Sequence, residues 1–282
     1  MLSKEKLHNL LNVLNLDNHY DVRDDDILNV LTAIQNDDDI AFLKTLFKIK
    51  TDKELDTHLI DNVFTLIKHE PNYKDNVLDS YTDAQVKAKR GVVDALDRLN
   101  LLNKCVTEVV IWGCWYGSVL IPLLHNKVKR IVCIDSDETV IEFGKNRLFK
   151  EYDNVEWMCH DIFEEYREVY DTTDIFINTS CEHMLPMKWW GPEGPRSKHD
   201  FFREWDGVEH EWPVYKRSWW SRVKSTAHFA FTSNNMFDIP GHINCVKSVT
   251  EFKHQLPENA EVLEEHDFTD ERGTRWLLIG KL

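Results

Sequence analysis

The chain has 282 residues, and its 49 acidic residues outnumber its 34 basic residues, which gives a formal net charge of -15. This charge disfavours DNA and RNA as partners, because affinity for a phosphate backbone comes largely from Lys and Arg. No apolar run approaches the roughly 20 residues of a membrane-spanning helix, and no signal-peptide pattern opens the chain, so we predict a cytoplasmic protein without membrane contact.

The first part of the chain, residues 1–103, has the hydrophobic spacing of helices. Apolar residues recur three and four positions apart in 7–14, 27–34, 40–47 and 59–67. Runs of three Asp at 24–26 and 37–39 precede two of these stretches. Carboxylates there cap helix N-termini, and an acidic metal-binding run is the alternative interpretation. We predict a helical amino-terminal region, and its role as a lid, a dimer surface or a dock for a protein partner stays open.

From residue 104 onward, short strands alternate with helices. Apolar runs lie at 109–112, 130–134, 155–159 and 174–177, and residues 137–149 have the spacing of a helix. This alternation predicts a mainly parallel, doubly wound α/β sheet. A polar turn at 270–273 joins the strand-like runs 262–265 and 276–279, which predicts an antiparallel hairpin at one edge. The predicted fold class is therefore a Rossmann-like α/β domain over residues 104–282, preceded by the helical region.

Cysteine usage indicates reduced thiols. The six cysteines stand singly, at Cys105, Cys114, Cys133, Cys159, Cys181 and Cys245, and no CxxC pair occurs. Most of them lie in or beside apolar segments, so we predict buried free thiols rather than a disulfide or zinc framework. We predict no metal site.

A long connection follows the fourth predicted strand. Residues 185–227 hold six of the ten tryptophans, Trp189, Trp190, Trp205, Trp212, Trp219 and Trp220. Long connections inside compact domains are usually functional or disordered, and a high aromatic content opposes disorder. We predict a lid over the carboxyl ends of the strands, and a structural cap without ligand contact is the alternative.

Four positions fall where strands of the predicted sheet end, which is where open α/β sheets bind ligands. In the turn GCWYGS, Gly113 permits a tight bend and Gly117 permits close approach to a ligand. Asp135 ends the second strand about 20 residues later, where a carboxylate accepts hydrogen bonds from both ribose hydroxyls. Asp161 ends the third strand beside the expected adenine position. The segment 178–183 follows the fourth strand, where reacting atoms would lie.

Each of these positions also has a structural interpretation. Asp135 is a candidate turn residue, Asp161 a candidate helix cap, and His183 a candidate structural hydrogen-bonding group. The order and spacing of all four positions favour the functional interpretation.

Residues 106–282 resemble the class I S-adenosylmethionine-dependent methyltransferases. The segments GCWYGS, INTSCEHM, TSNN and GHINCVKSVTEFKHQ, and SYTDAQVKAK before the first strand, are similar to a narrower group of methyltransferase-like proteins of bacteria and tailed phages. The resemblance implies S-adenosyl-L-methionine as cofactor and methyl transfer as the reaction. It also implies a location in the host cytoplasm or the virion if a phage encodes the chain.

The resemblance further implies the residues of the cofactor site. They are Gly113, Cys114, Trp115, Tyr116, Gly117, Asp135, Ser136, Asp161, Ile162, Asn178 and Thr179. The glycine turn would border the methionine moiety, and Asp135 would hold the ribose. Asp161 would bind adenine together with Ile162. Asn178 would face the sulfonium together with Thr179.

The glycine turn departs from the family pattern at two positions. The family carries an acidic residue just before the first glycine and a glycine at the centre, where this chain has Ile111 (or Trp112) and Trp115. An indole at the centre must swing aside or occupy part of the pocket. The missing acid removes a partner for the cofactor's ammonium group, and Glu182 or the segment 80–89 would replace it.

Methyl transfer is an in-line displacement, so the protein has to align a nucleophile and remove its proton. We predict that Asn178, Glu182 and His183 orient and deprotonate the acceptor, with Glu182 or His183 as the base. Four more polar residues would supply orienting hydrogen bonds: Asn234, Asn235, His242 and Asn244. The net charge favours a small-molecule or protein acceptor over a nucleic acid.

Two other functions stay open. One is a catalytically inactive binding or structural protein with a methyltransferase fold, such as a phage virion or assembly component. The other is a nicotinamide-dependent oxidoreductase, which also uses a glycine turn and an acidic second strand end. The missing GxGxxG motif and the terminal hairpin oppose the oxidoreductase.

Overall fold

The computed structural model describes residues 24–36, 45, 57–162, 168–189, 220, 223–270 and 272–282. The predicted helix at 7–14, nearly all of 40–47 and most of the Trp-rich connection lie outside these residues. The helices are α2 (Asp24–Gln35), α4 (Thr57–His69), α5 (Lys74–Asp79), α6 (Asp83–Arg98), α7 (Leu120–Leu124), α8 (Glu138–Phe143), α9 (Val169–Thr172) and α11 (Val249–Lys253). None of the helices described has the length and apolar composition needed to cross a membrane.

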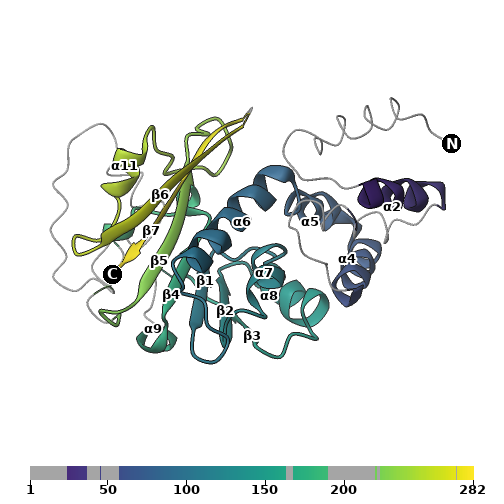
Figure 1. The fold of residues 1–282 in the computed structure, drawn as a ribbon, viewed down its shortest axis with the longest axis horizontal. Helices are drawn as coiled ribbons and strands as arrows, with labels where there is room; N and C mark the ends of the chain where they lie inside the picture. Colours follow the sequence, from purple (N-terminus) through teal and green to yellow (C-terminus); the bar gives the residue numbers. More distant parts are fainter. Residues whose placement is uncertain are drawn as a thin grey trace.

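Seven strands form one sheet in the order β3-β2-β1-β4-β5-β7-β6 (Figure 1). They are β1 (Glu108–Trp112), β2 (Arg130–Asp135), β3 (Val155–Cys159), β4 (Ile175–Asn178), β5 (His228–Asn234), β6 (Glu261–Asp270) and β7 (Gly273–Lys281). Strands β1 to β5 pair with one another in parallel, and β7 is antiparallel to both β5 and β6. The predicted doubly wound sheet with a carboxyl-terminal hairpin is confirmed. The strand order reverses between β1 and β4, where Trp112 pairs with Asn178.

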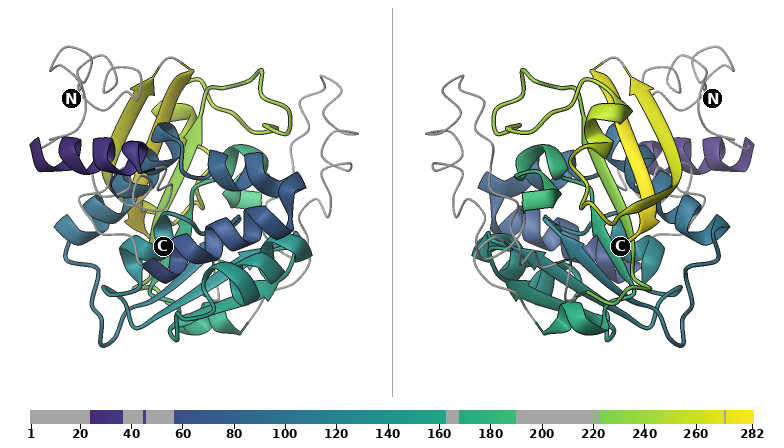
Figure 2. Two further views of the ribbon diagram at one scale, coloured as in Figure 1. Left: turned by 90° about the vertical axis from the view of Figure 1, so that its right-hand side faces the viewer. Right: turned by 90° about the vertical axis from the view of Figure 1, so that its left-hand side faces the viewer.

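Helices cover both faces of the sheet, as the two side views in Figure 2 show. On one face, a buried apolar cluster joins the sheet to α4, α5 and α6 through Leu59, Val77 and Val92. The other cluster includes Tyr170 of α9 and Phe252 of α11. The described amino-terminal helices α4 to α6 therefore share a hydrophobic core with the sheet.

Helix α6 approaches the hairpin closely. A Cβ atom at Gly91 would overlap the ring of Phe268 on β6, so glycine is required for this contact. Arg98 at the end of the same helix donates to Glu264 of β6 at 2.6 Å. This packing fixes α6 against the sheet and brings its buried Lys89 toward the carboxyl ends of the strands.

The predicted helix at 137–149 is shorter and less regular than expected. Asp137 caps α8 by accepting hydrogen bonds from the backbone amides of Thr139 and Val140. After α8 the chain widens into a π-helical turn, η2 (Gly144–Leu148). A Cβ atom at Gly144 would overlap the indole of Trp157 on β3, so the irregular turn coincides with close packing of helix against sheet.

All six cysteines are free thiols, as predicted. Cys114, Cys133 and Cys181 are buried, whereas Cys105 and Cys159 are exposed, so the prediction of burial is wrong for these two. Cys105 lies in the turn that precedes β1, and Cys159 ends the edge strand β3 at an outward-facing position. Apolar neighbours in sequence do not bury a residue whose strand has one face in solvent.

Candidate functional site

The glycine turn links β1 to α7 through three residues with left-handed backbone angles. The φ angles are 57° at Gly113, 48° at Trp115 and 64° at Gly117. The amide of Cys114 donates to the carbonyl of Ile134 at 3.1 Å, which ties the turn to β2. Two further side chains of the turn, those of Cys114 and Tyr116, are buried in the core, so only their backbone groups are able to reach a ligand.

Trp115 occupies the centre of this turn, and its backbone bonds to the candidate ribose residue. Its amide donates to Oδ2 of Asp135 at 2.9 Å. A left-handed conformation costs a non-glycine residue about 1–2 kcal/mol. The indole lies 5.3 Å from the ring of Tyr116, and Nζ of Lys89 lies 5.6 Å from its ring centroid. The contacts of this indole are thus with its own turn and with α6.

Asp135 lies at the junction of β2 and the glycine turn. Its Oδ1 accepts from the amide of Asp137 at 3.1 Å, and its carbonyl accepts from the amide of His160 at 2.9 Å. Burial raises the pKa of Asp135, and the amides of Trp115 and Asp137 oppose that rise. A carboxylate has about four lone-pair sites, so these two side-chain bonds leave acceptor capacity for ligand hydroxyls.

The other predicted cofactor residues follow the same strand ends. Ser136 is exposed next to Asp135. Asp161 is partly exposed after β3, whereas Ile162 is buried in the core beside it. Because Asp135 pairs with Cys159 in the sheet, the ends of β2 and β3 lie side by side. The predicted ribose and adenine residues thus share one edge of the sheet.

Asn178 ends β4, and its side chain is used within the loop that follows. The side chain is 0% exposed, its Oδ1 accepts from the amide of Ser180 at 2.8 Å, and its Nδ2 lies 3.0 Å from the sulfur of Met184. Thr179 is partly exposed beside it. Met184 was not singled out by the sequence, and it packs over the glycine turn.

We expect Gly113→Ala to lower the free energy of unfolding by about 1–2 kcal/mol. The alanine would have to adopt a φ of 57°, and its Cβ would lie 2.5 Å from Cε of Met184. Gly241→Ala is a matched control, because its φ is 86° but the nearest atom to the added Cβ is 3.6 Å away. Urea unfolding should show the larger loss of unfolding free energy for Gly113→Ala. Adding Met184→Ala to the Gly113→Ala protein should recover part of that loss, because it removes the atom that the new Cβ meets. Equal losses for both alanine variants would contradict the steric contact.

Glu182 lies in the short helix η3 (Cys181–His183) after β4, in a buried group of charges. Glu182 is 3% exposed, and its Oε1 lies 3.6 Å from Nη1 of Arg275 on β7. Burial raises the pKa of Glu182 to about 7, against the opposing effects of Arg275 and Lys89. Burial and Arg275 lower the pKa of Lys89 to about 8. A carboxylate, a guanidinium and an amine therefore meet in one buried place.

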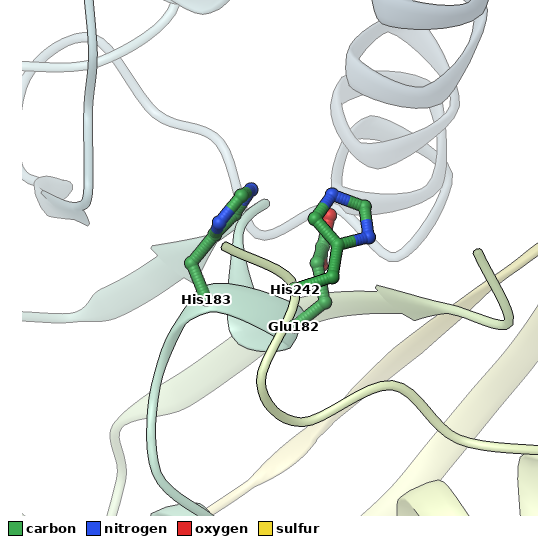
Figure 3. Close-up of side chains that lie close together, drawn as sticks. All are labelled: Glu182, His183 and His242. Carbon is green, nitrogen blue, oxygen red and sulfur yellow. The ribbon is translucent and has the colours of Figure 1, made fainter. Parts of the chain in front are cut away.

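His183 and His242 come together from different loops beside Glu182 (Figure 3). His183 follows Glu182 in η3, and His242 lies in the loop after β5. Their ring centroids are 4.6 Å apart with the planes nearly perpendicular. Burial and the neighbouring His183 lower the pKa of His242 to about 4. The structure thus places the imidazole of His242 beside the segment that follows β4.

The remaining polar residues after β5 are engaged in loop structure. Oδ1 of Asn234 accepts from the amide of Met236 at 2.9 Å, and Oδ1 of Asn235 accepts from the amide of Thr274 at 2.8 Å. Asn244 exchanges two side-chain hydrogen bonds with Gln255, both at 2.8 Å. These amides brace the loop that carries His242.

The sequence did not identify the charged partners of Glu182. Lys89 lies within the segment 80–89, but its burial depends on the packing of α6. Arg275 belongs to the hairpin, nearly a hundred residues beyond Glu182 in the chain, and nothing in its local sequence marks it. Of the Trp-rich connection, Trp220 is buried in the core, where its Nε1 donates to the carbonyl of Met187 at 2.8 Å. The other five tryptophans of that connection have no described side chain.

No protein-family model and no curated protein sequence matches the chain. Among solved structures, it is similar to the N-methyltransferase NodS from Bradyrhizobium japonicum WM9 in complex with S-adenosyl-L-homocysteine. That similarity has a TM-score of 0.52 at 13% identity and covers 78% of this chain and 98% of NodS. A geranyl diphosphate methyltransferase in complex with SAM gives 0.49 at 13% identity, over 74% of this chain and 90% of that one. The likeness to NodS shows the fold: the chain has the Rossmann-like fold of class I S-adenosylmethionine-dependent methyltransferases.

Proposed function

We propose that the protein transfers a methyl group from S-adenosyl-L-methionine to a small-molecule or protein acceptor. The observation that carries this proposal is the bond between the Asp135 carboxylate and the Trp115 amide, which links the acidic end of β2 to the glycine turn. The link lies beside the point where the strand order reverses, the usual ligand position in such sheets. Asp135 keeps acceptor capacity there for two ribose hydroxyls.

The rest of the proposed cofactor site follows the same edge. The glycine turn borders the methionine moiety through its backbone, and Asp161 with Ile162 receives the adenine. Lys89 lies beside the turn, where an amine pairs with the α-carboxylate of the methionine moiety. S-adenosylmethionine supplies its own activated leaving group, so the protein's task is to bind and align.

The proposed acceptor site lies at the loops that follow β4 and β5. Asn178 shapes the loop that carries Glu182 and His183, and one of these two side chains takes the acceptor's proton as the methyl group moves. The Trp-rich connection, residues 185–227, serves as the lid over the acceptor. The amino-terminal helices offer a docking surface to a protein partner, and α2 exposes Leu28 by 61%.

A catalytically inactive protein with the same fold is the second candidate. Trp115 stands where the family has glycine, and Met184 packs against Gly113 next to the proposed methionine position. In that case the fold would serve binding or assembly, including assembly of a phage virion.

Ligand binding separates these candidates. We expect S-adenosyl-L-homocysteine to stabilise the protein against heat by about 2.7 kcal/mol at a hundredfold excess over its Kd, because it binds the folded state alone. NADH at the same concentration should leave the melting temperature unchanged. Stabilisation by NADH alone would favour the oxidoreductase, and stabilisation by neither ligand would favour the inactive protein. Incubation with methyl-labelled cofactor then identifies the acceptor among candidate compounds.

A further inference from the structure

We propose that Glu182, His183 and His242 form a binding site for a divalent transition-metal ion of the Zn²⁺ class. One potential ligand atom from each of these residues lies within 4.8 Å of the others. Figure 3 shows the two imidazoles and the carboxylate gathered at the loops that follow β4 and β5. The sequence predicted no metal site, because the fold, and not a local motif, brings His242 to the other two residues.

The donor set suits this class of ion. Two imidazole nitrogens and one carboxylate oxygen are ligands of Zn²⁺, Fe²⁺ and Co²⁺, whereas Mg²⁺ and Ca²⁺ prefer oxygen ligands throughout. Two histidines and a glutamate with a fourth position open are a ligand set of catalytic zinc sites. An ion about 2.0–2.2 Å from each donor would draw the ligand atoms to roughly 3.5 Å from one another. Small displacements of the two partly exposed histidines that keep their outer hydrogen bonds supply that movement.

The hydrogen bonds of both histidines favour the tautomer in which Nε2 is the metal-binding nitrogen. Nδ1 of His183 lies 3.0 Å from the carbonyl of Gly241, and Nδ1 of His242 lies 3.0 Å from the carbonyl of Met236. A carbonyl only accepts, so each Nδ1 carries the proton, and each Nε2 keeps its lone pair. Metal-binding histidines typically have this outer hydrogen bond, which fixes the orientation of the ring.

Glu182 provides a buried oxygen in need of a partner. Glu182 is 3% exposed, and its Oε2 makes no hydrogen bond of normal geometry within the described residues, although the side chain of Asn234 is close enough to favour the charged carboxylate. An unpaired buried carboxylate oxygen is costly, and coordination to an ion would satisfy it. Arg275 lies 3.6 Å from the other oxygen, Oε1, so both oxygens of the carboxylate would then have a partner.

The two loops are joined before any ion binds. The amides of Ile243 and Asn244 both donate to the carbonyl of Glu182, at 2.8 and 2.9 Å. Cys245 lies 3.5 Å from Nδ1 of His242, the nitrogen opposite the proposed ligand, so its sulfur is outside the donor set. Such bracing orders the ligands in advance, which lowers the entropic cost of binding.

Nearby positive charges limit the affinity. Arg275 and Lys89 both interact with Glu182 and repel a cation. We therefore expect a Kd of about 1 μM, which is weaker than the affinity of structural zinc sites. An anionic oxygen or nitrogen of a ligand in the open position would offset that repulsion.

The metal site does not depend on the proposed methyl transfer. The two proposals use the same side chains, because Glu182 and His183 are also the candidate bases. An imidazole or carboxylate whose lone pair binds a metal is not available to accept a proton. With an ion bound, its charge would lower the pKa of an acceptor group held in the open position, and the three side chains would act as ligands instead of bases.

Zn²⁺ and Co²⁺ are the probes for this site, used with a chain that carries no histidine tag. We expect equilibrium dialysis to show one ion per chain, and bound Co²⁺ to give the visible spectrum of nitrogen and oxygen ligands. His183→Ala and His242→Ala should each weaken binding at least about tenfold, since even loss of an outer partner costs that much. His254→Ala, which removes an imidazole outside the cluster, should bind as the wild type does.

Two results would overturn the proposal: no retained ion, or wild-type affinity in both His183→Ala and His242→Ala. Circular dichroism of each variant checks that it is folded. The histidine variants are preferred to Glu182→Gln, because the latter also removes the charge that faces Arg275 and Lys89. A parallel titration with S-adenosyl-L-homocysteine keeps the two proposals apart, since zinc binding without cofactor binding would overturn methyl transfer alone.

Discussion

Asp135→Asn is expected to weaken the binding of S-adenosyl-L-homocysteine about a hundredfold, because hydrogen bonds to a charged group contribute about 1.5–3 kcal/mol each. The amide keeps the shape of the side chain and one oxygen acceptor. It loses the negative charge and places an NH₂ group where the second oxygen would accept from a ribose hydroxyl. Isothermal titration calorimetry of wild type and variant measures the difference.

Asp137→Ala is the matched control for this variant. Asp137 is the next acidic residue in the same loop, but its side chain caps α8 through the amides of Thr139 and Val140. Its loss should cost about 0.5–2 kcal/mol of stability and leave cofactor affinity unchanged. Since Asp135 also accepts from the amide of Trp115, the melting temperature of Asp135→Asn must be measured too. Wild-type affinity in a folded Asp135→Asn protein would rule out the ribose assignment.

Trp112→Ala is expected to lower the free energy of unfolding by about 3–5 kcal/mol, the usual cost of truncating a buried Trp. Trp112 is 1% exposed at the end of β1. Its ring stacks on Phe176 at 4.6 Å and meets the edges of Tyr170 and Trp220 at 5.5 and 5.6 Å. Truncation would leave a cavity at the centre of this aromatic cluster. Denaturant unfolding followed by circular dichroism measures the loss.

Phe237→Ala gives the comparison for an exposed aromatic residue. Phe237 is 52% exposed in the loop after β5, and its truncation should change stability by no more than about 0.5 kcal/mol. Trp112→Phe should fall between the two, because a smaller ring keeps part of the stacking. A loss below 1 kcal/mol in Trp112→Ala would show that this cluster does not stabilise the end of β1.

These aromatic contacts also explain how the glycine turn departs from the methyltransferase pattern. The residue before the first glycine is an acid in the family that the sequence resembles, and here the strand end is filled by Trp112 in the core. Glu182, a replacement acid expected from the sequence, already faces Arg275. Lys89 lies beside Trp115, so an amine stands next to the altered glycine turn.

The sequence by itself determined the strands, the mainly parallel sheet and the terminal hairpin, because periodicity and turn residues are local properties. It also placed Asp135 and Asn178 at strand ends, and β2 and β4 end at these two residues. The helix expected at 137–149 was less accurate, because packing of Trp157 against Gly144 is a tertiary contact. The likeness in fold to methyltransferases follows from the same local patterns.

Only the tertiary structure decided what surrounds Glu182. Arg275 reaches it from the hairpin, Lys89 from α6 and His242 from the loop after β5, so each neighbour comes from a distant part of the chain. Local sequence patterns carry no information about such contacts, because they depend on how strands and helices pack. Burial and charge at Glu182 arise from that packing, and so does the arrangement of donor atoms that would hold a metal ion.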